Sequence, residues 1–247
     1  MNKRYALPLS IAIIALCLLS FKQERKITIW MIGDSTMSVK NKEAYPETGW
    51  GMAFAEMFNQ KVAIENKAMN GRSTLSFITE KRWEEVERQL MPGDYVFIEF
   101  GHNDEKTDKA GVGTTPDEYK SNLAKFILEA RAKQAIPILM TPIARHKFKG
   151  NILEDTHGDY PKQVRLLADS LHAQMIDMLQ KTSGLLNKMG DLNSTSLFNY
   201  VDSGNVNYPQ GKKDNTHLSP AGANVVAELA IEGIKELNLP LAKYIKQ

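Results

Sequence analysis

The sequence predicts a single three-layer α/β/α sandwich built on a five-stranded parallel sheet. Short apolar, β-branched runs alternate along the chain with longer amphipathic segments, in the order β-α-β-α-β-α-β-α-β-α. The chain has 247 residues, of which 43% are hydrophobic and 24% charged, as is usual for one globular domain. It shows neither an internal repeat nor a linker, so its segments are expected to share one core.

The first predicted strand covers residues 27–32 and ends at a polar turn. Its residues are mostly apolar on both faces, which is typical of a buried strand in a parallel sheet. Gly33 and Asp34 tolerate the backbone angles of a sharp turn, so Ser35 is placed where a core strand ends. Open α/β sheets bind ligands at that edge, and Ser35 is therefore our candidate nucleophile. The alternative is an ordinary strand-to-loop turn.

The remaining elements follow from hydrophobic periodicity and from capping signals. We expect the other four strands at residues 62–64, 95–100, 136–140 and within 185–192. We expect helices at residues 49–58, 74–90 (broken), 115–133, 160–181 and 220–237. Thr115, Pro116 and Glu118 form a capping signal at one helix start. Residues 143–159 and 202–215 are predicted as loops.

Asp214 and His217 are three residues apart, just before the last predicted helix. On a tight turn this spacing brings the carboxylate onto one ring nitrogen, which leaves the other free to take a proton from a serine. An imidazole, whose free pKa is about 6.5, suits a general base near neutral pH. We therefore predict a Ser35–His217–Asp214 triad. The alternative is a histidine at a helix start that is simply bonded to Asp214.

Acyl transfer also needs donors for a tetrahedral oxyanion. The backbone amides of Ser35 and Gly71 and the side-chain amide of Asn103 all follow predicted strands, so they are expected to meet at one edge of the sheet. Each has a simpler explanation, as a turn glycine for Gly71 or a loop cap for Asn103. His102 is expected to have a structural role, either ordering Asn103 or packing.

Four sequence blocks carry a family resemblance: GDST at 33–36, GRS at 71–73, GHND at 101–104 and DNTH at 214–217 resemble, in order, the conserved blocks of SGNH (GDSL-type) hydrolases. Longer phrases, such as TPIAR at 141–145, resemble rhamnogalacturonan acetylesterases. The likeness covers essentially the whole mature chain, although residues 185–205 fit the family poorly. It implies an SGNH hydrolase-like, flavodoxin-like fold, the same triad and oxyanion donors, and removal of acetyl groups from the pectin backbone.

Two arginines are candidates for binding a polymer that contains galacturonate. Arg72 and Arg145 directly follow predicted strand ends, and an arginine fork suits a carboxylate. The alternative is that each pairs with a neighbouring acid or loop carbonyl. Trp30 and Trp50 are interpreted as core residues, whereas Trp83 fits either the core or stacking on sugar.

Residues 1–20 show the pattern of a signal peptide, with Lys3 and Arg4 before an apolar run and a small residue, Ser20, at the expected cut. We therefore divide the chain into a signal peptide, 1–20, and one esterase domain, 21–247, exported to the periplasm or beyond the cell. The bulky Leu16 before Cys17 argues against a lipoprotein anchor. Lys+Arg falls from 31 to 29 on cleavage and Asp+Glu stays at 29, so the mature chain is formally neutral.

A neutral chain offers no field for nucleic acid, and removal of the leader leaves no expected membrane insertion. Cys17 is the only cysteine, so the mature chain has no thiolate metal site, and we predict a metal-independent, cofactor-free monomer. The expected partner is an acetylated pectic polysaccharide or oligosaccharide. The alternatives are another SGNH esterase (acetylxylan or peptidoglycan O-acetyl esterase, lipase or thioesterase) and a non-catalytic carbohydrate-binding protein of the same fold.

Overall fold

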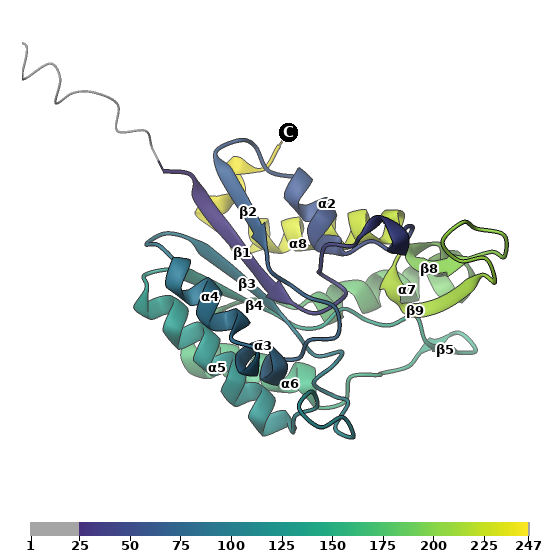
Figure 1. Ribbon diagram of the computed structural model, residues 1–247, viewed down its shortest axis with the longest axis horizontal. Coiled ribbons are helices and arrows are strands. Elements are labelled where there is room, and N and C mark those ends of the chain that lie inside the picture. Colours follow the sequence, from purple (N-terminus) through teal and green to yellow (C-terminus); the bar gives the residue numbers. More distant parts are fainter. Residues whose placement is uncertain (1–24, 247) are drawn as a thin grey trace, which may run out of the picture.

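The computed structural model describes residues 25–246 and places a parallel sheet between two layers of helices (Figure 1). The five strands of this sheet are β1 (Ile27–Gly33), β2 (Val62–Asn66), β3 (Tyr95–Glu99), β4 (Ile136–Met140) and β7 (Gln174–Ile176). Their spatial order is β2-β1-β3-β4-β7, and every neighbouring pair is parallel. The predicted fold class is confirmed. The predicted signal peptide, with Cys17, lies outside the described residues.

Helices cover both faces of the sheet, as Figure 1 shows. One layer contains α2 (Trp50–Glu56), α7 (Met178–Ser194) and α8 (Pro220–Glu236). The other contains α3 (Thr74–Thr79), α4 (Arg82–Gln89), α5 (Pro116–Ala132) and α6 (Tyr160–Leu171). Ile29 and Met31 of β1 pack into the core of the first layer, whereas Trp30 and Ile32 pack into the core of the second. The alternation of side chains along a strand thus supplies both cores.

The helix starts follow the capping chemistry of the sequence. Thr115 and Glu118 form a capping box at α5, in which each side chain accepts from the backbone N–H of the other. Ser219 caps α8, with its hydroxyl accepting from the Gly222 amide. The predicted break within residues 74–90 falls between α3 and α4, where Lys81 adopts a left-handed conformation. Among residues 25–246, no helix has the length and apolar character needed to cross a bilayer.

The prediction for the fifth strand was wrong. The fifth strand is β7, at residues 174–176, and the predicted location, 185–192, lies inside α7. The predicted helix 160–181 therefore divides into α6, β7 and the start of α7. His172 ends α6 in a left-handed conformation (φ 46°, ψ 47°). Apolar residues at 171, 175 and 178 mimic helical spacing because a three-residue strand is too short to show its own period.

Both predicted loops contain strands. Two short strands, β5 (Phe148–Lys149) and β6 (Ile152–Leu153), form a hairpin within residues 143–159, where Ile143 and His157 are buried. The segment 202–215 ends in β9 (Lys212–Leu218), which pairs antiparallel with β8 (Phe198–Val201). Three short 3-10 helices complete the described chain: η1 (Lys42–Ala44), η2 (Thr195–Leu197) and η3 (Pro240–Tyr244).

Candidate active site

Ser35 lies on the turn that follows β1, at the carboxyl edge of the sheet. The turn is held close to the neighbouring strand: a Cβ built on Gly33 would lie 2.5 Å from the Glu99 carbonyl oxygen, so only glycine fits there. Met69 donates its amide to the Gly33 carbonyl at 3.0 Å. Ser35 itself is 8% exposed.

A chain of two hydrogen bonds connects Ser35 to residues from the other end of the sequence. His217 Nε2 lies 2.9 Å from Ser35 Oγ, and His217 Nδ1 lies 2.8 Å from Asp214 Oδ2. In this arrangement Nδ1–H donates to the carboxylate, and Nε2 accepts from the serine hydroxyl. The spatial arrangement of Ser35, His217 and Asp214 is the one that a nucleophile, a base and an orienting acid require.

The local fold of β9 explains why a spacing of three residues brings the acid onto the ring. Phe198 pairs with Leu218 and Tyr200 pairs with Lys213, so residues 214–217 stand opposite Asn199 alone. This irregularity releases residues 214–217 from regular pairing with β8. Asp214 Oδ1 accepts from the amides of Thr216 and His217, both at 3.0 Å, while Oδ2 faces the imidazole. These bonds outweigh partial burial and hold the pKa of Asp214 below its ordinary value.

Three loops that carry the predicted oxyanion donors are tied to one another. Lys40 Nζ donates to the Ser35 carbonyl at 2.5 Å and to Asn70 Oδ1 at 2.7 Å, which joins the Ser35 turn to the loop of Gly71. Asn103 Nδ2 donates to the Arg72 carbonyl at 3.0 Å, which joins the next loop to the same turn. Gly71 has a φ of +77°, a left-handed conformation that favours glycine.

Lys106 determines which way the Asn103 amide points. Its Nζ donates to Asn103 Oδ1 at 2.6 Å, while one N–H of Asn103 Nδ2 is used by the Arg72 carbonyl. The amide is thereby held at both ends, with a second Nδ2–H remaining for an anion. Sequence reasoning did not single out Lys106, because nothing in its local sequence distinguishes it from other loop lysines.

Beneath the Ser35 turn lies a group that we call the buried cluster: Asp34, Glu99 and His102. The three side chains are 0–2% exposed. Thr36 Oγ1 lies 2.9 Å from Asp34 Oδ1 and 3.0 Å from Glu99 Oε2, and Trp50 Nε1 donates to Glu99 Oε2 at 3.1 Å. His102 Nδ1 lies 3.3 Å from Asp34 Oδ2. These contacts join the β1 turn, β3 and α2, and the structural role of His102 stays a prediction.

Desolvation dominates the electrostatics of the buried cluster. Burial, together with the neighbouring Asp34 charge, raises the pKa of Glu99 well above its ordinary value. Burial lowers the pKa of His102 to about 4, although Asp34 opposes the shift. Burial would also raise the pKa of Asp34, but contacts with His102 and Thr36 outweigh it and keep that carboxyl ionised. At neutral pH the cluster therefore holds one carboxylate, one carboxylic acid and one neutral imidazole.

A second charged group, which we call the flanking cluster, surrounds the triad: Lys40, Glu47 and Lys212. Glu47 Oε1 lies 2.9 Å from Lys40 Nζ, and Lys212 Nζ lies 3.0 Å from both Glu47 Oε2 and Asp214 Oδ2. Glu47, Asp214 and His217 also present ligand-type atoms close together, but the two carboxylates are already paired with two ammonium groups, Lys212 with both acids and Lys40 with Glu47. Sequence reasoning missed this cluster because its members lie far apart along the chain.

The two arginines predicted to bind substrate are both engaged within the protein. Arg72 Nε donates to Glu80 at 3.0 Å and its Nη1 donates to the Asn70 carbonyl at 2.9 Å. Arg145 forms an ion pair with Glu105 and donates to the Thr156 carbonyl. The structure therefore shows the alternative arrangement for each, in which the guanidinium ties loops together.

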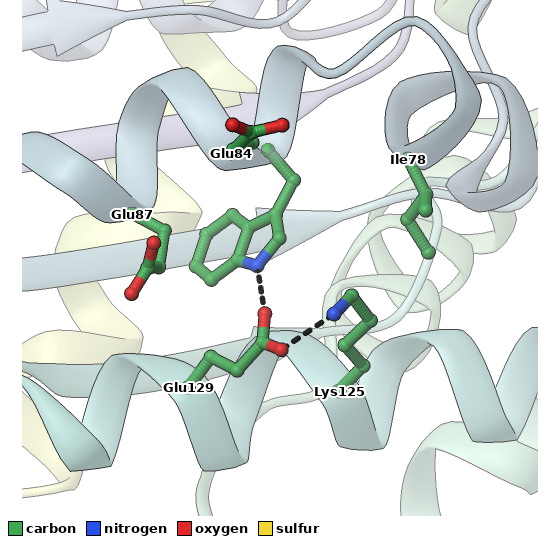
Figure 2. A pocket seen from close by; sticks show the side chains of 6 residues that line it. Ile78, Glu84, Glu87, Lys125 and Glu129 are labelled. Atoms are coloured by element: carbon green, nitrogen blue, oxygen red, sulfur yellow. Dashed lines mark hydrogen bonds and ion pairs between the residues drawn. The ribbon is translucent and has the colours of Figure 1, made fainter.

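Trp83 belongs to the core and not to an exposed sugar platform. It is 2% exposed, packs against Phe126 with ring centroids 4.9 Å apart, and donates its indole N–H to Glu129. The pocket beside it, of about 320 Å³, lies between α4 and α5 and is shown in Figure 2. Lys125 there is paired with Glu129, and the proposed triad and oxyanion residues do not line this pocket.

Known proteins of related sequence match most of this chain. Residues 29–230 match the family model described as GDSL-like lipase/acylhydrolase. The chain is 38% identical to the rhamnogalacturonan acetylesterase RhgT of Bacillus subtilis over 225 residues, which cover 90% of this chain and 95% of that protein. It is 31% identical to the probable rhamnogalacturonan acetylesterase YesY of the same organism, with 88% and 96% covered.

Solved structures share the fold. The structure of YxiM from Bacillus subtilis superposes with a TM-score of 0.75 at 24% identity, covering 87% of this chain and 58% of that one. This chain therefore spans little more than half of YxiM. The acetylxylan esterase Axe2 of Geobacillus stearothermophilus superposes with a TM-score of 0.62 at 19% identity, covering 89% and 98%. At these identities the likeness concerns the fold alone.

Proposed function

The chain belongs to the family of GDSL-like lipases and acylhydrolases, the SGNH esterases, and we propose that it removes O-acetyl groups from the rhamnogalacturonan backbone of pectin. The observation that supports the esterase mechanism is the chain of hydrogen bonds from Ser35 Oγ to His217 Nε2, at 2.9 Å, and from His217 Nδ1 to Asp214 Oδ2, at 2.8 Å. The substrate class is supported by relatives at 31–38% identity that are named rhamnogalacturonan acetylesterases or probable ones.

In the proposed acylation step, Ser35 Oγ attacks the acetyl carbonyl and its proton passes to His217 Nε2. Asp214 accepts the Nδ1–H and stabilises the imidazolium. The negative charge on the tetrahedral oxygen is met by the amides of Ser35 and Gly71 and by the free N–H of Asn103. When the intermediate collapses, His217 returns the proton to the departing sugar hydroxyl, and an acetyl-enzyme remains.

Deacylation repeats the sequence with water. His217 removes a proton from the water as its oxygen attacks the acetyl carbon, and the same three donors receive the oxyanion. Ser35 then leaves with the proton from His217, so that acetate is released and the free serine is restored. Each proton that the base accepts is therefore returned within the same half-reaction.

The substrate class is tested by measuring acetate release from acetylated rhamnogalacturonan oligosaccharides beside acetylated xylan and acetylated peptidoglycan. The proposal expects the pectic substrate to give the highest kcat/KM, and Ser35→Ala to abolish release from all substrates while the circular dichroism spectrum stays unchanged. A higher kcat/KM on xylan or peptidoglycan would contradict the pectic assignment. Full activity of Ser35→Ala, or no reaction with a serine-directed phosphonate, would contradict the esterase mechanism.

We also propose that the protein is exported, on the evidence of the charged start and apolar run in residues 1–20. Expression of the full chain in a bacterial host should release a mature protein that begins near residue 21. Mass spectrometry of the periplasmic and culture fractions measures this, and an uncleaved chain that stays in the cytoplasm would contradict export.

A further inference from the structure

The flanking cluster places a second carboxylate beside the imidazole of the triad. Glu47 Oε1 lies 4.0 Å from His217 Nε2, the nitrogen that faces Ser35. Asp214 occupies the opposite side of the ring, against Nδ1. The imidazole is therefore flanked by one acid at each nitrogen, and the two acids come from segments that are far apart in the sequence.

Glu47 is held in this place by two lysines. Its Oε1 is 2.9 Å from Lys40 Nζ and its Oε2 is 3.0 Å from Lys212 Nζ. The Glu47 side chain is 9% exposed and that of Lys40 is 2% exposed. Lys40 is in turn fixed by the Ser35 carbonyl and by Asn70. The carboxylate is therefore anchored to the same turn that carries the nucleophile.

The charges around Glu47 keep it ionised. Burial alone would raise its pKa, but the His217 and Lys40 charges and the lysine hydrogen bonds outweigh burial and lower it. Lys212 has a raised pKa because its bonds to Glu47 and Asp214 outweigh its own desolvation. At neutral pH a carboxylate thus stands near Nε2, and the Lys212 ammonium connects it to Asp214, the acid at Nδ1.

We propose that Glu47 is a positioning residue of the esterase, which stabilises the protonated form of His217 by its charge while Lys212 opposes it. This inference rests on the proposed function. At 4.0 Å the carboxylate is beyond hydrogen-bond distance of Nε2, so it does not compete with Ser35 for that nitrogen. Its effect is Coulombic and grows when the serine proton arrives on Nε2 and the ring becomes positive.

The charged groups around the imidazole predict in which direction each substitution changes the stability of the imidazolium. Ser35 comes from the β1 turn, Glu47 from the loop before α2 and Asp214 from β9. Lys212 of β9 contacts both acids, and Lys40 contacts Glu47. Removing the negative charge of Glu47 disfavours the imidazolium, whereas removing the positive charge of Lys212 favours it. A purely structural role for the two side chains would lower activity in both variants without opposite shifts.

The experiment compares Glu47→Gln and Lys212→Met in the full chain, with Glu43→Gln as the matched control. Glu43 is an exposed glutamate of η1 in the same loop, four residues from Glu47. The first measurement is the pH dependence of kcat/KM on an aryl acetate. The second is the nuclear magnetic resonance titration of the His217 ring, which is assigned among the five histidines with His217→Gln.

We expect Glu47→Gln to lower kcat/KM about 10-fold near neutral pH and to move the acid limb of the profile by about 0.5–1 unit to lower pH. Lys212→Met should move it to higher pH, and Glu43→Gln should leave it in place. The ring titration should shift in the same two directions. If Glu47→Gln does not fold, Lys212→Met, at a half-buried residue, still tests whether the acid limb moves in the predicted direction.

The inference would be overturned if the acid limb and the ring titration stayed in place in Glu47→Gln and Lys212→Met. It would also be overturned if both variants shifted them in the same direction. The failure of the proposed function has a different signature. A wild-type protein that does not hydrolyse the aryl acetate would contradict the esterase, while the ring titration would still support or overturn the electrostatic role of Glu47.

Discussion

The buried cluster and the flanking cluster both hold ionisable side chains away from water close to Ser35, but they stabilise them in different ways. The buried cluster holds Glu99 and His102 in their neutral forms: burial and the Asp34 charge together raise the pKa of Glu99, whereas for His102 burial outweighs the opposing Asp34 charge. The flanking cluster keeps its acid ionised, because two ammonium groups contact Glu47. The difference teaches that desolvation sets the protonation states in the buried cluster, whereas pairing with ammonium groups sets them in the flanking cluster, which lies beside the base.

This comparison predicts that changes near the imidazole alter activity and that changes in and around the buried cluster alter stability. The largest expected effect is that of Asp214→Asn. The amide cannot orient the imidazole or stabilise its charge, so kcat should fall about 10³–10⁴-fold. The free energy of unfolding should fall by only about 1–2 kcal/mol, because Asn keeps the Oδ1 that accepts from the Thr216 and His217 amides and loses only the charge toward His217 and Lys212.

Both quantities can be measured on one preparation, by aryl acetate hydrolysis and by urea unfolding. A loss of activity below 10-fold would show that Asp214 is not the acid that orients the His217 imidazole and stabilises its charge. A large loss of stability with little loss of activity would reverse the assignment of roles to the two clusters.

The next effect concerns the buried cluster itself. Thr36→Val keeps the shape of the side chain and removes the hydroxyl that lies between Asp34 and Glu99. Two buried carboxyl groups then lose a hydrogen-bond partner, and the free energy of unfolding should fall by about 2–4 kcal/mol. The activity of each folded molecule, counted by phosphonate labelling, should stay within about 3-fold.

Thr79→Val is the matched control, because Thr79 is exposed and bonds only the Ser76 carbonyl within α3. It should cost less than about 0.5 kcal/mol. Equal losses of stability in the two variants would show that the buried hydroxyl has no special role.

A smaller effect depends on pH. Burial raises the pKa of Asp104 to about 7, against the hydrogen bonds from Thr74. Between the unfolded value of about 3.9 and this value, the folded state binds a proton that the unfolded state has lost, so this group's contribution to stability falls as pH rises. Asp104→Asn removes that dependence.

Urea unfolding at pH 5 and pH 8 measures the change. Relative to wild type, Asp104→Asn should be more stable at pH 8 than at pH 5, by about 1–3 kcal/mol. His102, whose pKa is lowered to about 4, acts in the opposite direction below pH 6.5 and is common to both proteins, so it cancels in the difference. A difference that does not change with pH would contradict a raised pKa at this site.

The smallest expected effect comes from an exposed ion pair outside both clusters. Arg72→Ala breaks the pair with Glu80, and surface pairs of this kind contribute less than about 1 kcal/mol. The KM for an acetylated, galacturonate-containing oligosaccharide should change less than about 2-fold. A large rise in KM would return Arg72 to the role of a substrate ligand.

Much of the fold was predictable because local chemistry specifies it. The four longer strands, the capping box at α5 and the spacing of Asp214 and His217 each lie within a short segment. β7 was mispredicted because a three-residue strand shows no period of its own and is defined by pairing with β4. One signal was overlooked: Glu99 is an acid inside an otherwise apolar strand, and a buried acid requires partners.

The sequence by itself determined the fold class, the order of the main strands and the residues that meet as Ser35, His217 and Asp214. Only the tertiary structure decided that Lys40, Glu47 and Lys212 gather around the imidazole and that Arg72 and Arg145 are paired internally. The physical reason is one of range. Caps, turns and apolar alternation act over a few residues, whereas ion pairs such as that of Lys212 with Glu47 join positions that only the completed fold brings within 3.0 Å.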